Sequence, residues 1–585
     1  MILPKFPKFG IFTALLIAAL LLSACSVSEA KGMKPSPDWS KGVPVADGAA
    51  GSMGFAVRPD GGALYLVYPY TAAEGVRLRY LQLDQDAAPV VDRELDLPIE
   101  RLRSPRLLLA EGDQLHLFWG DRQGGGGWGI WYALLDQDGG LAGEPVRITP
   151  EEVDVAHFEA APAGGGGAVV VWDSQRDPAI YGLEIEPSGQ VEGDPVQIAQ
   201  VGSAPSLAVG ADGSIDIAWV DDEGIRAAHL PDGELAPAEG SLISPIATGT
   251  GDTVFGPVVG RSDGWVYVFW SLLSRSGLRS GQATTSFASY PAGADAGDSD
   301  AEVIPIIPLE KPPYGPYTGM FSLTQLVPGA GTPFRSAYVY EPNPIKSELG
   351  ELAIGISTEQ ALRQDLVVQV ATLLFEDGEF KGYTFSGKTP GFSSNPFPAA
   401  DSEGNLYIAW RDGSAGEKIY LATTSPEMRA SIDRIQAGDI VNTVLQGGIE
   451  GAATMLLFPL AIPWVVPGFI LLGLWKVFRD YESLRARSSW VVLVIALVLY
   501  EVTKILFLPT VLEYVPFSAW IDIPQGLSSP LRIVFPLLSL GAGIALAELN
   551  RRRRSQSTLL YYTIVVFTDL LITLAVYGVA YLGVF

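Results

Sequence analysis

The stretch SEGNLYIAWRD, residues 402–412, joins a glycine turn to alternating apolar residues that end in Trp410 and Asp412. Apolar side chains at every second position are typical of a β-strand with a buried face, and the residues before them favour a turn. The same order of features recurs upstream in strands ending at Tyr68, Trp119, Trp172, Trp219, Trp270 and Tyr340. The copy at Tyr340 is the weakest. A repeat of this kind predicts an architecture built from similar units.

Each copy has further strand-like pieces around it. In the second copy, a short apolar run precedes it at 104–112, another alternating run follows at 129–139, and a short piece at 144–149 closes the unit. Four strands in about 50 residues are typical of a β-propeller blade. Blades stack around an axis because one blade cannot cover both of its apolar faces, and the recurrent aromatic ring fills the gap between neighbours. We predict an all-β propeller of seven blades, or of six if the interrupted copy at Tyr340 forms none.

The predicted ring also has to close. The last copy has only three clear strands before the chain becomes strongly apolar, whereas KGVPVAD, residues 41–47, resembles the closing pieces of earlier copies. We therefore expect residues 41–47 to pair with residues 419–423 and complete the last blade.

The repeat resembles that of the sialidase-like, Asp-box (BNR-type) propellers, most clearly in DSEGNLYIAWRD at 401–412. The resemblance covers residues 52–424 and implies a propeller whose family enzymes carry an early arginine motif, an arginine triad and a Tyr–Glu nucleophile pair. Here no copy has the complete box, and the nearest arginine string is PFRSA, with Arg335 late in the chain. The sequence therefore names no catalytic residue and favours a protein that is not an enzyme.

Composition divides the chain into two parts. Hydrophobic residues make up 48% of the 585 residues, yet the formal net charge is −26. Residues 431–585 carry 11 Lys plus Arg and 10 Asp plus Glu, which leaves 28 basic and 55 acidic residues for the first 430. An acidic module of this kind repels nucleic acid. One cysteine and three scattered histidines give neither a disulfide nor a zinc spacing, and no motif indicates a cofactor.

The N-terminus is typical of an export signal. Two lysines precede an apolar run at 11–22, which is followed by small residues. Leu22-Ser23-Ala24-Cys25 resembles the bacterial lipobox, which implies a signal peptide at 1–24 and a lipid on Cys25. The alternative is an uncleaved N-terminal anchor with an incidental cysteine. Residues 25–40 are expected to form a tether between this anchor and a propeller at 41–430.

The domain at 431–585 contains four apolar stretches, at about 455–478, 490–508, 531–549 and 558–585. Each has the length needed to cross a bilayer as a helix, so we predict an all-α transmembrane four-helix bundle. Prolines at 459, 463 and 467 predict a kinked first span, and a re-entrant hairpin is the alternative.

Basic residues predict the orientation of these spans. The first connection carries Arg479, Arg485 and Arg487, the third carries residues 551–554, and the second has no Lys or Arg. Because basic loops remain in the cytoplasm, the propeller and the C-terminus are expected outside, at the cytoplasmic (inner) membrane of a bacterium.

Three ionisable residues lie within the predicted spans. Glu501 and Lys504 share one face of the second span, and Asp569 lies near the middle of the fourth. Charges in lipid are costly, so they indicate a proton or ion path or a buried switch. The alternative is a neutralised pair that joins two helices.

Two acidic loops, at 135–140 and 210–214, have the oxygen-rich character that calcium prefers. Asp-Gly is also common turn chemistry, and the sequence favours turns without a metal. Gly-rich runs, at 122–129 and 163–169, lack a following GK[ST] and are not phosphate loops.

These features lead to one preferred function and two alternatives. We expect a membrane-anchored, extracytoplasmic propeller that binds an extracellular carbohydrate or protein ligand and has the lipid bilayer as its other partner. One alternative is a divergent sialidase-type glycoside hydrolase, which needs two facing carboxyls. The other is the sensor domain of a small transport or signalling bundle, which requires Glu501, Lys504 and Asp569 to meet.

Overall fold

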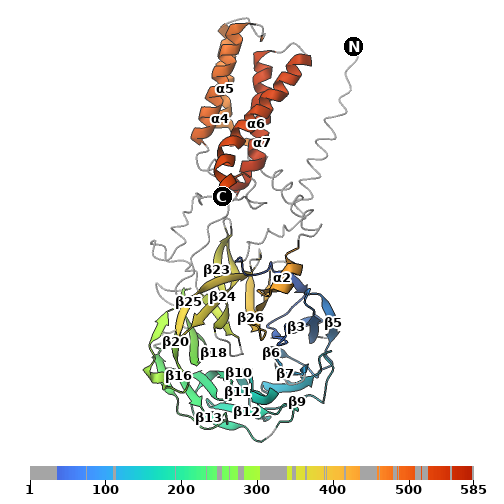
Figure 1. Ribbon diagram of the computed structural model, residues 1–585, viewed down its shortest axis with the longest axis vertical. Helices are drawn as coiled ribbons and strands as arrows, with labels where there is room; N and C mark the ends of the chain where they lie inside the picture. Colours follow the sequence, from blue (N-terminus) through green and yellow to red (C-terminus); the bar gives the residue numbers. More distant parts are fainter. Residues whose placement is uncertain are drawn as a thin grey trace.

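The computed structural model describes residues 36–434 and 458–582. Within these ranges it leaves out residues 74, 110–112, 192, 232, 247–252, 263, 275–281, 304–338, 346–350, 363–364, 388, 390–391, 414–416, 460, 479–483, 485, 508–514, 517–524 and 554–556. Figure 1 shows a ring of small sheets, with a group of helices beyond its rim near the strands β23 (Leu352–Leu362) and β26 (Ser393–Ala400).

The described residues form seven antiparallel sheets of four strands each, and every sheet is one blade. The strands of the first four blades run in sequence order from the axis outward. They are β2 (Gly54–Val57), β3 (Leu64–Ala72), β4 (Gly75–Leu83) and β5 (Pro89–Glu94); β6 (Leu102–Leu109), β7 (Leu115–Asp121), β8 (Gly129–Leu135) and β9 (Val146–Arg147); β10 (Val155–Pro162), β11 (Ala168–Ser174), β12 (Ile180–Ile185) and β13 (Val196–Ala199); and β14 (Ser203–Val209), β15 (Ile215–Val220), β16 (Gly224–Leu230) and β17 (Ser241–Pro245).

The last three blades complete the ring. They contain β18 (Thr253–Ser262), β19 (Trp265–Ser274), β20 (Gln282–Pro291) and β21 (Ala301–Val303); β22 (Val339–Pro344), β23 (Leu352–Leu362), β24 (Asp365–Glu376) and β25 (Glu379–Gly387); and β26 (Ser393–Ala400), β27 (Leu406–Asp412), β28 (Lys418–Thr423) and β1 (Val43–Ala46). Short 3₁₀ turns occur at η2 (Gly164–Gly166) and η4 (Ala296–Asp298). Each innermost strand contacts the innermost strands of both neighbouring blades, so the ring is closed. The predicted seven-bladed propeller is confirmed.

The recurrent aromatic residues fill the seams between blades, as expected. Each seam has its own cluster of buried apolar side chains, and Trp119, Trp172 and Trp219 each lie in the cluster that joins their blade to the preceding one. Trp270 and Trp410 occupy the corresponding places in two later seams. All five side chains are at most 4% exposed. A large ring at each seam buries much apolar area, and this burial stabilises the stacking.

The predicted anchor of the sixth blade is wrong. Tyr340 lies on β22, the innermost strand of that blade, and pairs with Ser357 of β23. The place of the Trp is taken on β23 by Ile356, which is fully buried in the cluster between the fifth and sixth blades. An aliphatic residue fills this seam because three phenylalanines already crowd it: Phe269 and Phe287 lie edge-on to Phe375, with centroids 5.1 and 5.0 Å away.

The ring closes as predicted, by an N-terminal strand in the last blade. β1 pairs antiparallel with β28, with Val43 opposite Leu421 and Ala46 opposite Ile419. Residues 36–40, which belong to the expected tether, also pack on the ring. Trp39 is 4% exposed and donates from Nε1 to Thr384 Oγ1 at 3.0 Å. Its apolar ring joins the cluster that contains Trp410, between the sixth and seventh blades.

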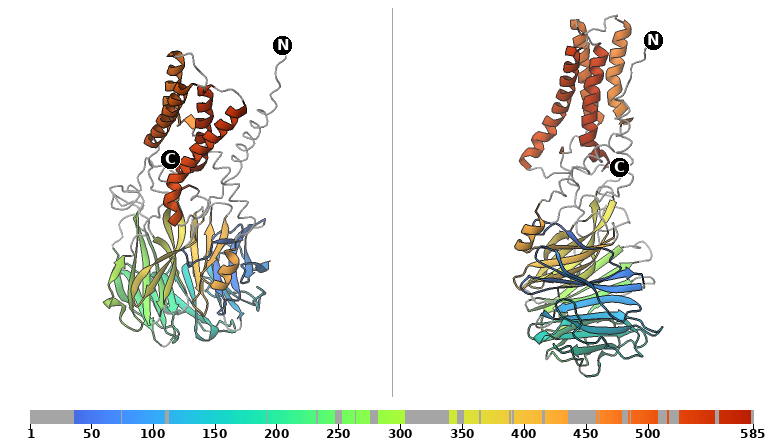
Figure 2. Two further views of the ribbon diagram at one scale, coloured as in Figure 1. Left: turned by 45° about the horizontal axis from the view of Figure 1, so that its top comes forward. Right: turned by 90° about the vertical axis from the view of Figure 1, so that its right-hand side faces the viewer.

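The C-terminal part of the described chain is helical. A short helix, α2 (Pro426–Ile432), lies on the ring, and four apolar helices follow: α4 (Ile462–Phe478), α5 (Arg487–Phe507), α6 (Gln525–Arg553) and α7 (Thr558–Leu582). Residues Arg487–Phe507, Ser529–Arg552 and Thr558–Gly578 are each long and apolar enough to cross a membrane, whereas α4 has 17 residues. The C-terminal end of α7 lies on the propeller side of the helices (Figure 2).

The first predicted span, at about 455–478, and the observed helix α4 begin at different residues. The described helix begins at Ile462, so Pro459 precedes it and Pro463 lies in its first turn, where proline is tolerated. Only Pro467 lies in the helix interior, and the helix continues without a hairpin to Phe478. The residues at 451–457 fall outside the described part.

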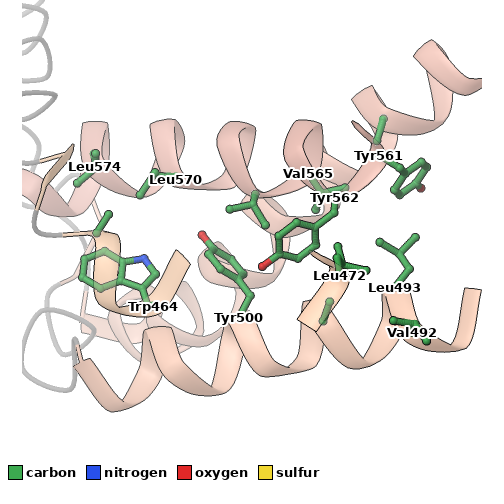
Figure 3. Close-up of a cluster of buried hydrophobic side chains, with 14 of the residues drawn as sticks. Trp464, Leu472, Val492, Leu493, Tyr500, Tyr561, Tyr562, Val565, Leu570 and Leu574 are labelled. Carbon is green, nitrogen blue, oxygen red and sulfur yellow. The ribbon is translucent and has the colours of Figure 1, made fainter. Parts of the chain in front are cut away.

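Packing around α7 holds the helices together. It contacts α4, α5 and α6, and Figure 3 shows tyrosines and aliphatic residues filling the space between the helices. Helix α6 approaches most closely at Gly543, where a Cβ atom would lie 2.6 Å from the backbone oxygen of Val565. A small residue is therefore needed at this crossing.

Candidate functional site

The innermost strands of several blades carry an irregularity at the start of the strand. Residues Ser104, Ala204 and Asn395 have positive φ angles of 48°, 50° and 52°, and each precedes a proline. The pairing with the second strand shifts at the same points. A β-bulge of this kind turns the side chains that follow it, and here those side chains include Arg106 and Phe397.

A cavity of about 380 Å³ lies at the centre of the ring. Its lining comes from the innermost strands β2, β6, β10, β22 and β26, and most of it is apolar or proline, including Phe55, Pro344 and Phe397. The polar exceptions include Arg106, Glu159 and Asn343. Cavities of this size with few polar groups are typical of ligand sites.

Arg106 joins three blades across this cavity. Its Nε and Nη2 donate to the two carboxylate oxygens of Glu159 on the next blade, at 3.2 and 3.3 Å. Its guanidinium lies 5.7 Å from the ring centroid of Phe397, which belongs to the seventh blade. The side chains of Arg106 and Glu159 are 22% and 18% exposed, so the ion pair remains accessible from the cavity.

The two carboxylates that line the cavity are both engaged. Glu159 accepts the Arg106 fork, and Asp401 accepts the backbone N–H groups of Glu403 and Asn405 at 3.0 and 2.9 Å. Asp401 also accepts the hydroxyl of Tyr407 at 3.0 Å, and burial raises the pKa of Tyr407 to about 12. Each of these two described carboxylates is therefore held by contacts within the protein.

The aspartates that follow the aromatic anchors have structural contacts. Asp121, 1% exposed, accepts the backbone N–H of Arg101 at 2.7 Å. Asp173 accepts the N–H of Ala204, at the start of the next blade, at 2.8 Å. Burial raises the pKa of Asp173, but hydrogen bonds and the charge of His157 outweigh burial and hold its pKa below the usual value. These aspartates tie blades together.

Two of the three histidines lie in buried networks that the sequence did not reveal. His116, fully buried, contacts the Tyr132 hydroxyl through Nδ1 at 2.8 Å and the Gly166 carbonyl through Nε2 at 2.9 Å. His229 contacts Asp216, which also accepts Arg261 Nη1 from the next blade at 3.0 Å. Both networks join strands inside the walls of the ring.

The acidic loops singled out in the sequence form turns. Asp136 Oδ1 accepts the N–H groups of Asp138 and Gly140 at 2.9 and 2.6 Å, and Asp212 Oδ1 accepts the N–H and hydroxyl of Ser214. An aspartate that bonds the backbone two residues on is a common turn device.

The structure brings the three ionisable residues of the helical domain together. Lys504 Nζ lies 3.0 Å from Glu501 Oε1 and 2.8 Å from Asp569 Oδ2. Asp569 also accepts the hydroxyls of Tyr500 at Oδ2 and Ser539 at Oδ1, both at 2.6 Å. Tyr500 points from α5 toward α7 (Figure 3). We call Tyr500, Glu501, Lys504, Ser539 and Asp569 the polar cluster.

Several predicted features lie outside the described residues. These are the signal peptide at 1–24, the lipid site Cys25, the tether up to residue 35 and the arginine string around Arg335. The arginine at the cavity, Arg106, and its partner Glu159 were not predicted. The sequence did contain one sign that these two residues are equivalent: Arg106 lies 13 residues before Trp119, and Glu159 lies 13 residues before Trp172.

No protein-family model and no curated protein matches this chain. Solved structures that match it include an endo-arabinase from Bacteroides thetaiotaomicron VPI-5482, at 12% identity, 65% of this chain, 96% of that chain and a TM-score of 0.31. The polysaccharide lyase Uly1 matches at 10% identity over 65% and 90% of the two chains, with a TM-score of 0.41. The WD40 domain of Toxoplasma gondii coronin matches at 12% identity over 67% and 85%, with a TM-score of 0.38. Such low scores support no inference about activity.

The architecture of the described chain defines the class of protein. The chain is a seven-bladed β-propeller, closed by its own N-terminal strand and followed by apolar helices, three of them long enough to cross a membrane.

Proposed function

We propose that the protein is a membrane-anchored, extracytoplasmic propeller that binds a carbohydrate or protein ligand at its central cavity without catalysing a reaction. The observation that carries this proposal is the accessible Arg106–Glu159 pair inside a mostly apolar cavity. Apolar walls favour burial of a ligand surface, and a few fixed polar groups give orientation. A ligand that carries hydroxyl groups meets a guanidinium and a carboxylate there, which their mutual ion pair holds side by side.

The engaged carboxylates argue for binding over hydrolysis. A glycoside hydrolase needs one carboxyl as an acid and another as a base or nucleophile. Glu159 is neutralised by a bidentate arginine, and Asp401 is held by its own turn. The repeat resembles that of sialidases, but the described cavity lining gives no support to their catalytic arrangement.

Charge at the helix ends supports the proposed orientation. Lys476 ends α4, Arg487 begins α5, and Arg551–Arg553 end α6, so these cations share one end of the helical domain. The C-terminal end of α7 lies on the propeller side, and α7 therefore begins at the basic end (Figure 2). Basic ends remain cytoplasmic, which supports a propeller outside the inner membrane of a bacterium. A signal peptide and a lipid on Cys25 agree with this orientation.

Ligand binding is tested with the full chain in lipid nanodiscs. Thermal unfolding of the propeller is measured in the presence of soluble neutral oligosaccharides, uronate oligosaccharides and short peptides. A ligand that binds the folded state stabilises it by about 2.7 kcal/mol at 100 times its Kd. The shift should disappear in Arg106→Ala and remain in Arg79→Ala, which removes an arginine that pairs with Asp92 on outer strands. A shift that Arg106→Ala leaves unchanged contradicts the cavity as the binding site.

The location is tested by adding protease to intact spheroplasts. Cleavage of the propeller without lysis is expected. Protection until lysis contradicts the extracytoplasmic location, whatever the ligand experiment gives.

A further inference from the structure

The polar cluster lies inside the helical domain, near the middle of α6 and α7. Lys504 is 1% exposed and Asp569 is fully buried. Thr503, beside Lys504 on α5, donates to the Trp464 carbonyl of α4 at 3.0 Å. Four helices therefore meet at this level, and the groups that touch Asp569 come from α5 and α6.

The charges of the cluster do not balance. Two carboxyls, Glu501 and Asp569, contact one ammonium, that of Lys504. The described cations at the far end of the bundle do not correct this local imbalance, because Lys476, Arg487 and Arg551–Arg553 lie about three turns or more away along their helices. If all three groups of the cluster are ionised, one negative charge remains inside an apolar helical domain, which is costly.

The other ionisable groups near Asp569 are neutral or distant. Tyr500 faces it from α5 with its hydroxyl, and α6 contributes Ser539, which carries no charge. Along α7, Tyr562 and Tyr577 lie about two turns from Asp569. Arg532 lies about two turns before Ser539 on α6.

We propose that Glu501, Lys504 and Asp569 form a proton-binding site within the helical domain, and that Glu501 carries the exchangeable proton. Asp569 accepts hydrogen bonds from Lys504, Tyr500 and Ser539, and three donors stabilise a carboxylate. Glu501 has a hydrogen bond from Lys504, and its side chain is 23% exposed at the surface of α5. A proton therefore enters and leaves the site at Glu501, the carboxyl of the cluster that other groups do not fully enclose.

A proton fits this site better than a metal ion. The ammonium of Lys504 already occupies the space between the two carboxylates, within 3.0 Å of each. A metal cation would have to displace it from both. A proton on Glu501 neutralises the excess charge without moving the lysine.

Proton binding also changes the contact between helices. When Glu501 is ionised, Lys504 is shared between α5 and α7. When Glu501 is protonated, the ammonium interacts mainly with Asp569, so the α5–α7 ion pair strengthens. The site thus links local pH to the packing of the helices that carry the propeller.

The test is infrared spectroscopy of the full chain in nanodiscs, with the protonated carboxyl band followed from acid to alkaline pH. All 65 Asp and Glu residues absorb in this region when protonated, so the band is read above about pH 6, where carboxyls with the usual pKa of about 4 are ionised. There the wild type should retain a carboxyl band that disappears reversibly as the pH rises further. Glu501→Gln should abolish this band, and Lys504→Met, which removes the ammonium, should increase it about twofold because both carboxyls then hold protons. The control Glu548→Gln, a carboxylate of the same bundle, should leave the band unchanged.

The wild-type titration requires no variant, so it decides the proposal even if a variant fails to fold. A wild type without the band above about pH 6 overturns the proposal. A band that persists in folded Glu501→Gln also overturns it. Replacing potassium by sodium at constant pH should have no effect, and loss of the band with sodium would show a metal cation as the ligand instead.

Discussion

Replacing Trp39 by alanine should weaken closure of the ring, because Trp39 packs the N-terminal segment into the seam between the sixth and seventh blades. Its indole lies with Val370, Ile408, Trp410 and Ala422 and is 4% exposed. Truncating a buried Trp costs about 3–5 kcal/mol. The lost hydrogen bond to Thr384 adds about 1 kcal/mol. The expected loss is therefore about 4–6 kcal/mol, which is comparable with the whole stability of many domains.

The assay is urea unfolding of the full chain in nanodiscs, followed by the far-ultraviolet circular dichroism of the strands. Thr384→Val is the matched variant, because it keeps the indole and removes only its acceptor. It should cost about 1–3 kcal/mol, the penalty of a buried donor left without a partner. The reasoning is refuted if Trp39→Ala lowers the free energy of unfolding by less than Thr384→Val does. That result would mean that burial of the Trp39 ring contributes little to the closed ring.

Two further predictions concern a buried histidine and a helix crossing. Burial lowers the pKa of His116 from its usual value of 6.5, so the unfolded chain binds a proton there that the folded chain does not. Stability should fall as the pH drops below about 6.5, by at most about 1.4 kcal/mol per unit, and His116→Gln should flatten this slope in urea titrations at several pH values. Gly543→Val should destabilise the α6–α7 contact by about 1–3 kcal/mol, because its new atoms meet the Val565 backbone. Gly541→Val is the control, since a Cβ atom at that position would meet no neighbouring atom of the described chain within 4 Å, and equal melting temperatures for the two variants would contradict the close-contact argument.

The blades could be predicted from the sequence because their signals are local. A glycine turn, alternating apolar residues and a seam-filling Trp lie within about ten residues, as in the stretch that ends at Trp410. The closing strand was predictable because residues 41–47 resemble the closing pieces of other repeats. The sixth blade was predicted, but its anchor was misassigned, because Ile356 replaces the Trp and Tyr340 ends a similar apolar run on the neighbouring strand.

The cavity could not be predicted because its lining comes from five strands of different blades. Whether Arg106 meets Glu159 depends on the bulges that aim the side chains, and bulges leave little trace in one sequence. The polar cluster was more accessible to prediction, because charged residues in apolar helices are conspicuous. Its hydrogen bond from Ser539 depends on how α6 packs, which hydropathy does not reveal.

The chain segments before and after the ring, at 37–41 and 429–433, are hydrogen-bonded to each other. Arg429 of α2 donates to the Pro37 carbonyl at 2.6 Å, and the N–H of Lys41 donates to Asp433 at 2.9 Å. A pull on one segment is therefore transmitted to the other through these two hydrogen bonds at the edge of the ring. Trp39 lies in the seam between the sixth and seventh blades, and Met428 and Ile432 of α2 lie in the seam between the seventh and first. A pull on either segment is therefore also resisted by the apolar packing of these two seams.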